Sequence, residues 1–154
     1  MVGELKKGTS FHDLTEGVVA EILIKAASNA PEDYANARLS CKLLRDTSNA
    51  FHIFKNIDFP ERYRYPLRQA EVNLKLKCLQ NKNPKVLFEE GAYRMFRDYP
   101  RMEKGYQLMR EAVAAGFVPA IYMLGIVMLS FRGEDNNKGL QILRSLTLSA
   151  RKGK

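Results

Sequence analysis

The first third of the chain places apolar residues at helical spacing. A capping-box pattern begins at Asp13, and the apolar residues behind it recur every three or four positions, which predicts a helix over 14–27. Pro31 opens a second predicted helix over 31–47, because proline suits the first helical turn and two acidic residues follow it. Phenylalanine and isoleucine cluster over 49–57 and predict a short third helix that closes a small core.

A basic connector separates these helices from the rest of the chain. Phe59-Pro60 and Tyr65-Pro66 bracket it, and the residue before a proline disfavours helix. Helical spacing of apolar residues resumes at Leu67 and predicts a fourth helix over 67–81.

Beyond Asn83-Pro84 the sequence repeats itself with a period of 34 residues. The matched positions pair Leu87 with Ile121, Phe88 with Tyr122, Gly91 with Gly125, Met95 with Leu129, Gly105 with Gly139, Leu108 with Ile142, and Met109 with Leu143. This period is typical of tetratricopeptide-like helix-turn-helix repeats, whose small residues allow two helices to approach closely.

The repeat predicts two helical hairpins. Helices over 84–97 and 101–115 form the first, and helices over 118–131 and 135–149 form the second. Each such unit buries one face against a neighbour, so the helix over 67–81 is expected to cap one side.

One long uncharged stretch raises the question of a membrane span. Twenty residues without charge lie between Glu111 and Arg132, which is long enough to cross a bilayer. Gly116 and Pro119 interrupt the stretch, so we interpret it as parts of two packed helices with a tight turn between them. The N-terminus lacks the apolar segment of a secretory signal.

Charge is distributed unevenly along the chain of 154 residues, whose net charge is +8. Residues 1–60 carry 7 basic and 8 acidic groups, whereas residues 61–154 carry 18 and 9. This asymmetry suggests acidic partners for the second half. The candidate residues for binding an acidic partner are Arg62, Arg64, Arg68, Lys75 and Lys77.

Tyr63 and Tyr65 interleave with these basic residues, an arrangement that could hold a phosphate backbone and stack bases. The alternative is that the basic stems cover helix flanks and both tyrosines pack at the junction. No nucleic-acid-binding motif accompanies the charge, which favours the second interpretation.

The sequence offers no convergent catalytic constellation, so we expect a protein that is not an enzyme and holds no metal or cofactor. His12 and His52 are the only histidines, and no phosphate-loop, dinucleotide-binding or zinc-protease motif occurs. Cys41 and Cys78 fall on apolar helical stripes, lie far apart and lack metal-binding spacing. Their use suits a reducing compartment, the cytoplasm or the nucleus.

Residues 11–57 resemble an F-box. The family pattern Leu-Pro-x-x-(apolar)-(apolar)-x-Glu-Ile-Leu is matched by residues 14–23, with Thr15 in place of proline. Residues 37–46 are similar to the family's (apolar)-x-x-Val-Cys-Lys-x-Trp segment, with Leu44 where tryptophan is common.

The second half resembles the SEL-type repeats that follow the F-box in short plant F-box proteins. In those repeats Asn-Pro-x-x-Leu-(aromatic)-x-x-Gly opens the first unit, as residues 83–91 do here. An Ala-Ala-x-Gly-x-x-x-Ala junction joins it to the next, as residues 114–120 do in similar form. The resemblance implies an all-α protein, a three-helix F-box followed by α/α repeats. Together with the sequence pattern it predicts five segments: a disordered lead over 1–10, the F-box over 11–59, the basic connector and capping helix over 60–83, two helical-hairpin repeats over 84–150, and a frayed tail over 151–154.

In this family the F-box docks a Skp-type adaptor, which connects it to cullin and a RING subunit, while the other region holds the substrate for ubiquitin transfer. The resemblance therefore implies a non-catalytic substrate receptor with a protein target. The expected adaptor contacts are apolar and small polar residues of the first two helices: Leu14, Thr15, Val18, Ile22, Leu23, Leu39, Ser40 and Leu44.

Two alternatives remain open. The departures at Thr15 and Leu44, together with Gly17 in the first helical turn, allow a helical interaction protein whose F-box has decayed. The basic second half allows a nucleic-acid-binding protein.

Overall fold

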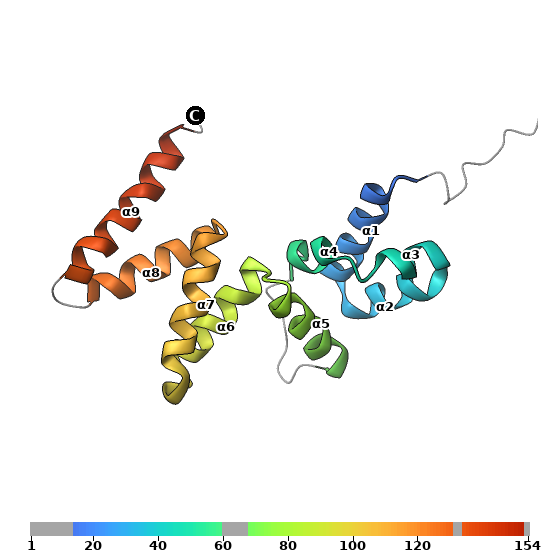
Figure 1. Ribbon diagram of the computed structural model, residues 1–154, viewed down its shortest axis with the longest axis horizontal. Coiled ribbons are helices and arrows are strands. Elements are labelled where there is room, and N and C mark those ends of the chain that lie inside the picture. Colours follow the sequence, from blue (N-terminus) through green and yellow to red (C-terminus); the bar gives the residue numbers. More distant parts are fainter. Residues whose placement is uncertain (1–13, 60–67, 131–133, 153–154) are drawn as a thin grey trace, which may run out of the picture. The chain divides into compact units, whose positions relative to one another are not determined.

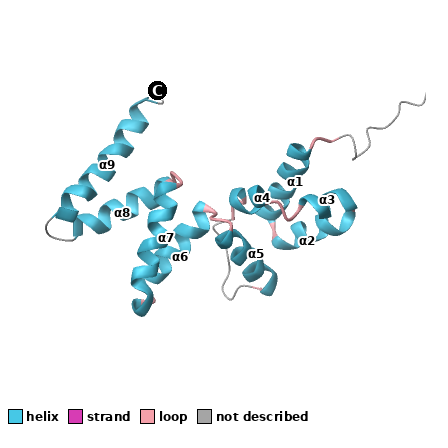
Figure 2. Cartoon of the chain, in the orientation of Figure 1, coloured by secondary structure: helices cyan, strands magenta, loops and turns pink. Residues whose placement is uncertain are grey.

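The computed structural model describes residues 14–59, 68–130 and 134–152, and every regular element in these ranges is a helix (Figures 1 and 2). The all-α fold class is confirmed. The chain divides into two compact units, unit 1 over Met1–Leu74 and unit 2 over Lys75–Lys154.

Unit 1 is built around its first helix. Helix α1 spans Glu16–Asn29 and packs against α2 (Pro31–Ser40), α3 (Lys42–Thr47) and α4 (Phe51–Asn56). One face of α1 is buried, with residues that recur at helical spacing: Val19, Ala20, Leu23 and Ala27. Buried side chains from the other elements complete the core, among them Tyr34, Leu44, Ile53, Phe54 and Ile57.

The first helix begins later than the capping-box pattern predicts. Thr15 occupies the N-cap, and its carbonyl accepts from the Val19 amide at 3.1 Å. Asp13 lies outside the described residues. The Thr15 backbone is extended, as at other helix N-caps, and its side chain makes no capping hydrogen bond.

The single helix predicted over 31–47 is wrong, because the chain breaks at Cys41. This residue is extended, with φ −155° and ψ 161°, and its Sγ accepts from the Leu44 amide at 3.5 Å. The sulfur thus caps α3, which leaves Leu44 buried in the core. The buried Tyr34 hydroxyl donates to the Ser48 carbonyl and holds α2 to the end of α3. Periodicity alone misses this break because apolar spacing continues across it.

Helix α5 spans Gln69–Gln80, close to the predicted 67–81, and the division between the units falls within it. Its second half is tied to unit 2. Lys75 Nζ lies 2.9 Å from a carboxylate oxygen of Glu89, and the Cys78 carbonyl accepts from the amide of Asn83 at 2.9 Å.

Unit 2 contains two antiparallel helical hairpins, as the repeat predicts. Helix α6 (Pro84–Phe96) pairs with α7 (Met102–Ala114), and α8 (Val118–Ser130) pairs with α9 (Glu134–Lys152). A short 3-10 turn, η2 (Tyr99–Arg101), precedes α7, and contacts between α7 and α8 join the hairpins. Among the described helices, none combines the length and apolar character needed to cross a bilayer.

The last helix continues further than predicted. Helix α9 runs to Lys152, three residues beyond the predicted end. Residues 153–154 lie outside the described residues.

Glycines mark the crossing point of each hairpin. A Cβ placed on Gly105 would lie 2.8 Å from the carbonyl oxygen of Gly91 and 2.7 Å from the amide nitrogen of Met95. In the second hairpin a Cβ on Gly139 would lie 2.8 Å from the carbonyl oxygen of Gly125 and 3.0 Å from the amide nitrogen of Leu129, the repeat equivalent of Met95. The same backbone contact therefore occurs twice, in register with the sequence repeat.

Asn83 caps the first repeat helix from a buried position. Its side-chain oxygen accepts from the amides of Lys85 at 3.1 Å and Val86 at 3.2 Å. We expect Asn83→Ala to lower the free energy of unfolding of unit 2 by about 1–2 kcal/mol, because two helix-end amides lose their acceptor. Urea denaturation followed by circular dichroism measures this loss. Asn83→Asp keeps the acceptor and is the matched control; an equal loss in both variants would contradict the capping role.

Candidate binding surfaces

Unit 1 exposes large apolar side chains although its core is closed. On α1, Val18 and Ile22 lie one turn apart and are 42% and 37% exposed. On α2, Leu39 is 82% exposed. We call these three residues the apolar docking set. Exposed apolar groups of this size make these residues candidates for contact with another protein.

The structure divides the residues predicted to contact an adaptor. Leu23 and Leu44 are buried, at 0% and 4% exposure, because they complete the core of unit 1. They are not available for docking, and their inclusion in the contact set is corrected here. Of the remaining residues, Leu14 is half-buried, whereas Thr15 and Ser40 are exposed.

The predicted cations belong to different parts of the chain. Arg62 and Arg64 lie outside the described residues, and Arg68 belongs to unit 1 whereas Lys75 and Lys77 belong to unit 2. Arg68 and Lys75 each form an ion pair with an acidic residue of their own unit.

Arg68 pairs with Glu32 at the start of α2, with Nη1 and Oε1 3.0 Å apart. Backbone hydrogen bonding and this guanidinium lower the pKa of the Glu32 carboxyl. In unit 2, Lys75 pairs with Glu89. These cations therefore tie helices together, which weakens the hypothesis of one continuous basic surface.

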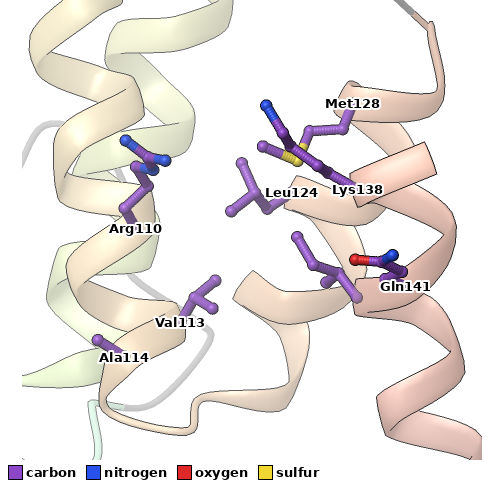
Figure 3. A pocket seen from close by; sticks show the side chains of 8 residues that line it. Arg110, Val113, Ala114, Leu124, Met128, Lys138 and Gln141 are labelled. Atoms are coloured by element: carbon purple, nitrogen blue, oxygen red, sulfur yellow. The ribbon is translucent and has the colours of Figure 1, made fainter. Parts of the chain in front are cut away.

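Sequence reasoning missed a groove in unit 2. It has a volume of about 540 Å³ and lies between α7 on one side and α8 and α9 on the other (Figure 3). We call it the α7–α9 groove; its lining residues are Arg110, Val113, Ala114, Leu124, Met128, Lys138, Gln141 and Ile142. Three helices contribute to it, so no local pattern in the sequence indicates it.

The described residues offer little that could perform chemistry. No cluster of three or more His, Cys, Asp or Glu side chains suited to a metal occurs among them. His52 is exposed on α4, and His12 lies outside the described residues. Burial raises the pKa of the Cys78 thiol to about 12, which suppresses the reactive thiolate.

The two cysteines should differ in reactivity. Cys78 is fully buried and its thiol stays protonated at neutral pH, whereas Cys41 is half-buried at a helix end. We expect iodoacetamide to label Cys41 about tenfold faster or more in the folded protein. Peptide mass spectrometry over time gives both rates, and unfolding in urea should make them equal. Equal rates before unfolding would contradict the buried position of Cys78.

Comparisons with known proteins address both halves of the chain. The family described as plant tetratrico peptide repeats matches residues 63–154. The F-box protein At2g35280 of Arabidopsis thaliana is 30% identical over 118 residues, which cover 76% of this chain and 69% of that protein. No solved structure matches this chain significantly.

A second relative extends the similarity over most of the chain. The Arabidopsis thaliana protein At1g67623, named as a candidate F-box protein, is 25% identical over 141 residues, or 92% of this chain. The chain spans about half the length of that relative, 47%.

An all-α unit with an exposed apolar face, followed by paired helical hairpins at a period of 34 residues, defines a class of helical binding proteins. The family matches make this class specific. The chain belongs to the plant F-box proteins that carry tetratricopeptide repeats.

Proposed function

We propose that this chain is the substrate-recognition subunit of an SCF-type ubiquitin ligase. Unit 1 would bind a Skp-type adaptor and, through it, cullin and a RING subunit, and unit 2 would bind the target protein. The chain itself would take no part in ubiquitin transfer. Family membership supports this proposal, and the exposed apolar docking set carries it.

The physical basis is burial of apolar surface that unit 1 leaves open. Val19 and Leu23 fill the inner face of α1 and are fully buried, whereas Val18 and Ile22 on its outer face keep 42% and 37% of their surface exposed. An adaptor helix that packs on this face would remove their apolar area from water, which is the main source of affinity in helix docking. The proposed contact set is therefore Leu14, Thr15, Val18, Ile22, Leu39 and Ser40.

Two members of the proposed contact set are polar, and one of them, Thr15, replaces the proline of the family pattern. Thr15 at the N-cap and Ser40 at the end of α2 are exposed. The Ser40 hydroxyl donates to the Ala37 carbonyl at 2.8 Å, and its oxygen can still accept a hydrogen bond from a partner. Such an assembly would work in the cytoplasm or nucleus, compartments that two free cysteines suit.

Co-expression with a Skp-type adaptor tests the proposal. Size-exclusion chromatography of the pair and of the chain alone should give a one-to-one complex and an aggregation-prone free chain, because the docking set is then uncovered. A chain that is monodisperse alone and elutes apart from the adaptor would reject the receptor function. Binding of RNA that weakens steeply as the salt concentration rises would instead support nucleic-acid binding.

A further inference from the structure

We infer that the α7–α9 groove binds a short peptide segment in which acidic and bulky apolar residues alternate. The inference rests on the proposed function, since it names the class of target segment that unit 2 would hold. The groove has a volume of about 540 Å³ and is largely open to solvent, so an extended segment could lie in it without being enclosed. Several side chains fit in such a space.

The floor of the groove is apolar. Leu124 and Met128 of α8 are buried members of the unit 2 core, and Val113 of α7 and Ile142 of α9 pack against that core. Figure 3 shows Val113 and Leu124 extending into the gap from opposite sides. Ala114 adds only a methyl group to the α7 wall, which leaves the space open. A leucine-sized side chain would bury apolar area here that water now covers.

The rim of the groove is cationic. Arg110 on α7 and Lys138 on α9 lie near the same end of it in Figure 3, and none of the eight lining residues is acidic. The Arg110 guanidinium lies 5.4 Å from the centre of the Tyr106 ring on its own helix. The neighbouring carboxylate of Glu111 is directed elsewhere, since it lies 3.3 Å from Lys82 Nζ. The lining therefore places two cationic side chains and no acidic one at the edge of an apolar floor.

This combination favours a peptide over the other occupants. A nucleic-acid strand presents a phosphate at every nucleotide and needs a row of cations, whereas this groove offers two cations and an apolar floor. A second copy of the chain would bring another basic surface, because residues 61–154 carry 18 basic and 9 acidic groups. In an extended acidic peptide, successive side chains point to opposite sides, so leucines can enter the groove while glutamates face the rim.

Fluorescence anisotropy with the full chain tests this inference. The probe is a short fluorescein-labelled peptide of alternating Glu and Leu; matched peptides replace Glu by Gln or Leu by Ser. We expect the Glu/Leu peptide to bind and both matched peptides to bind at least about tenfold more weakly, since each lacks one of the two complementary features.

Variants of the groove locate the binding. Arg110→Glu with Lys138→Glu should weaken binding of the Glu/Leu peptide by about tenfold or more, because attraction becomes repulsion. Gln141→Trp should also weaken it by filling the groove from an exposed position. Lys104→Glu is the matched control: it makes the same charge change on α7 away from the groove, and binding should persist.

Three results would overturn the inference: no binding of the Glu/Leu peptide, equal binding of the Gln/Leu peptide, or equal binding by all variants. A dimer or an oligonucleotide complex that the groove variants abolish would assign the groove to that occupant instead. Adaptor co-purification and peptide binding, both measured with the unsubstituted chain, separate the two proposals. A chain that retains the adaptor but does not bind the Glu/Leu peptide rejects the groove alone, and a chain that binds the peptide but not the adaptor rejects the receptor function alone.

Discussion

Gly105→Ala should lower the free energy of unfolding of the first repeat hairpin by about 3 kcal/mol, a loss within the range for overpacking a contact that has no free space. The added Cβ would meet the Met95 amide nitrogen at 2.7 Å and the Gly91 oxygen at 2.8 Å. Both atoms belong to the backbone of the facing helix, so no side-chain rotation relieves the overlap and α6 must move away from α7. Hydrogen exchange followed by mass spectrometry should show loss of protection in α6 and α7 while unit 1 keeps its protection.

Two other glycines provide graded controls. At Gly125 the added Cβ would meet side-chain atoms of Leu143 at 2.7 Å, and a leucine side chain can rotate, so Gly125→Ala should destabilise less. At Gly17 nothing lies within 4 Å, and alanine should raise the stability of α1 by up to about 1 kcal/mol. If Gly105→Ala keeps wild-type exchange rates, the close crossing of α6 and α7 is wrong.

This difference between glycines shows what the sequence could predict about the fold. The 34-residue period places Gly91 with Gly125 and Gly105 with Gly139, and small residues at matched positions predict a close helix crossing. The period cannot tell which glycine faces backbone and which faces a side chain. That distinction depends on the rotation of each helix about its axis, which only the packed hairpin sets.

The sequence predicts the end of a helix where a residue strongly prefers one position in the helix. Pro31 and Pro84 sit in first turns, as their fixed φ requires. The sequence does not predict the break at Cys41, because cysteine has no strong capping preference and the apolar spacing continues across it. Tertiary packing of Leu44 decides the matter there.

The candidate sites depend still more on packing. Ile22 and Leu23 are neighbours in sequence and equally apolar, yet one is exposed and the other is fully buried. The family pattern alone proposes both as adaptor contacts, and only the position of α2, α3 and α4 around α1 separates them. The α7–α9 groove is further from prediction, since its walls come from three helices.

Ile22→Asp should lower affinity for a Skp-type adaptor by about a hundredfold or more, equivalent to about 3 kcal/mol. An aspartate at this position would place a carboxylate in an apolar interface without a partner, which costs more than the lost contact alone. In the free chain Ile22 is 37% exposed, so an aspartate at this position keeps access to water; we expect unit 1 to remain folded with some loss of stability, because the covered part of the isoleucine is also lost. Leu39→Asp should act in the same way from α2. Co-purification with the adaptor and circular dichroism of each variant measure binding and fold separately.

Two further variants decide whether the outer face of α1 is the cause. His52→Asp adds the same charge to an exposed position on α4 outside the proposed contact set, and adaptor binding should persist. Leu23→Ala removes a fully buried side chain and should lower stability by about 2–5 kcal/mol, so its binding is lost only through unfolding. An adaptor that still binds Ile22→Asp at wild-type strength would show that this face is not the docking surface. Equal losses in Ile22→Asp and His52→Asp would mean that added negative charge, and not the apolar face, controls binding.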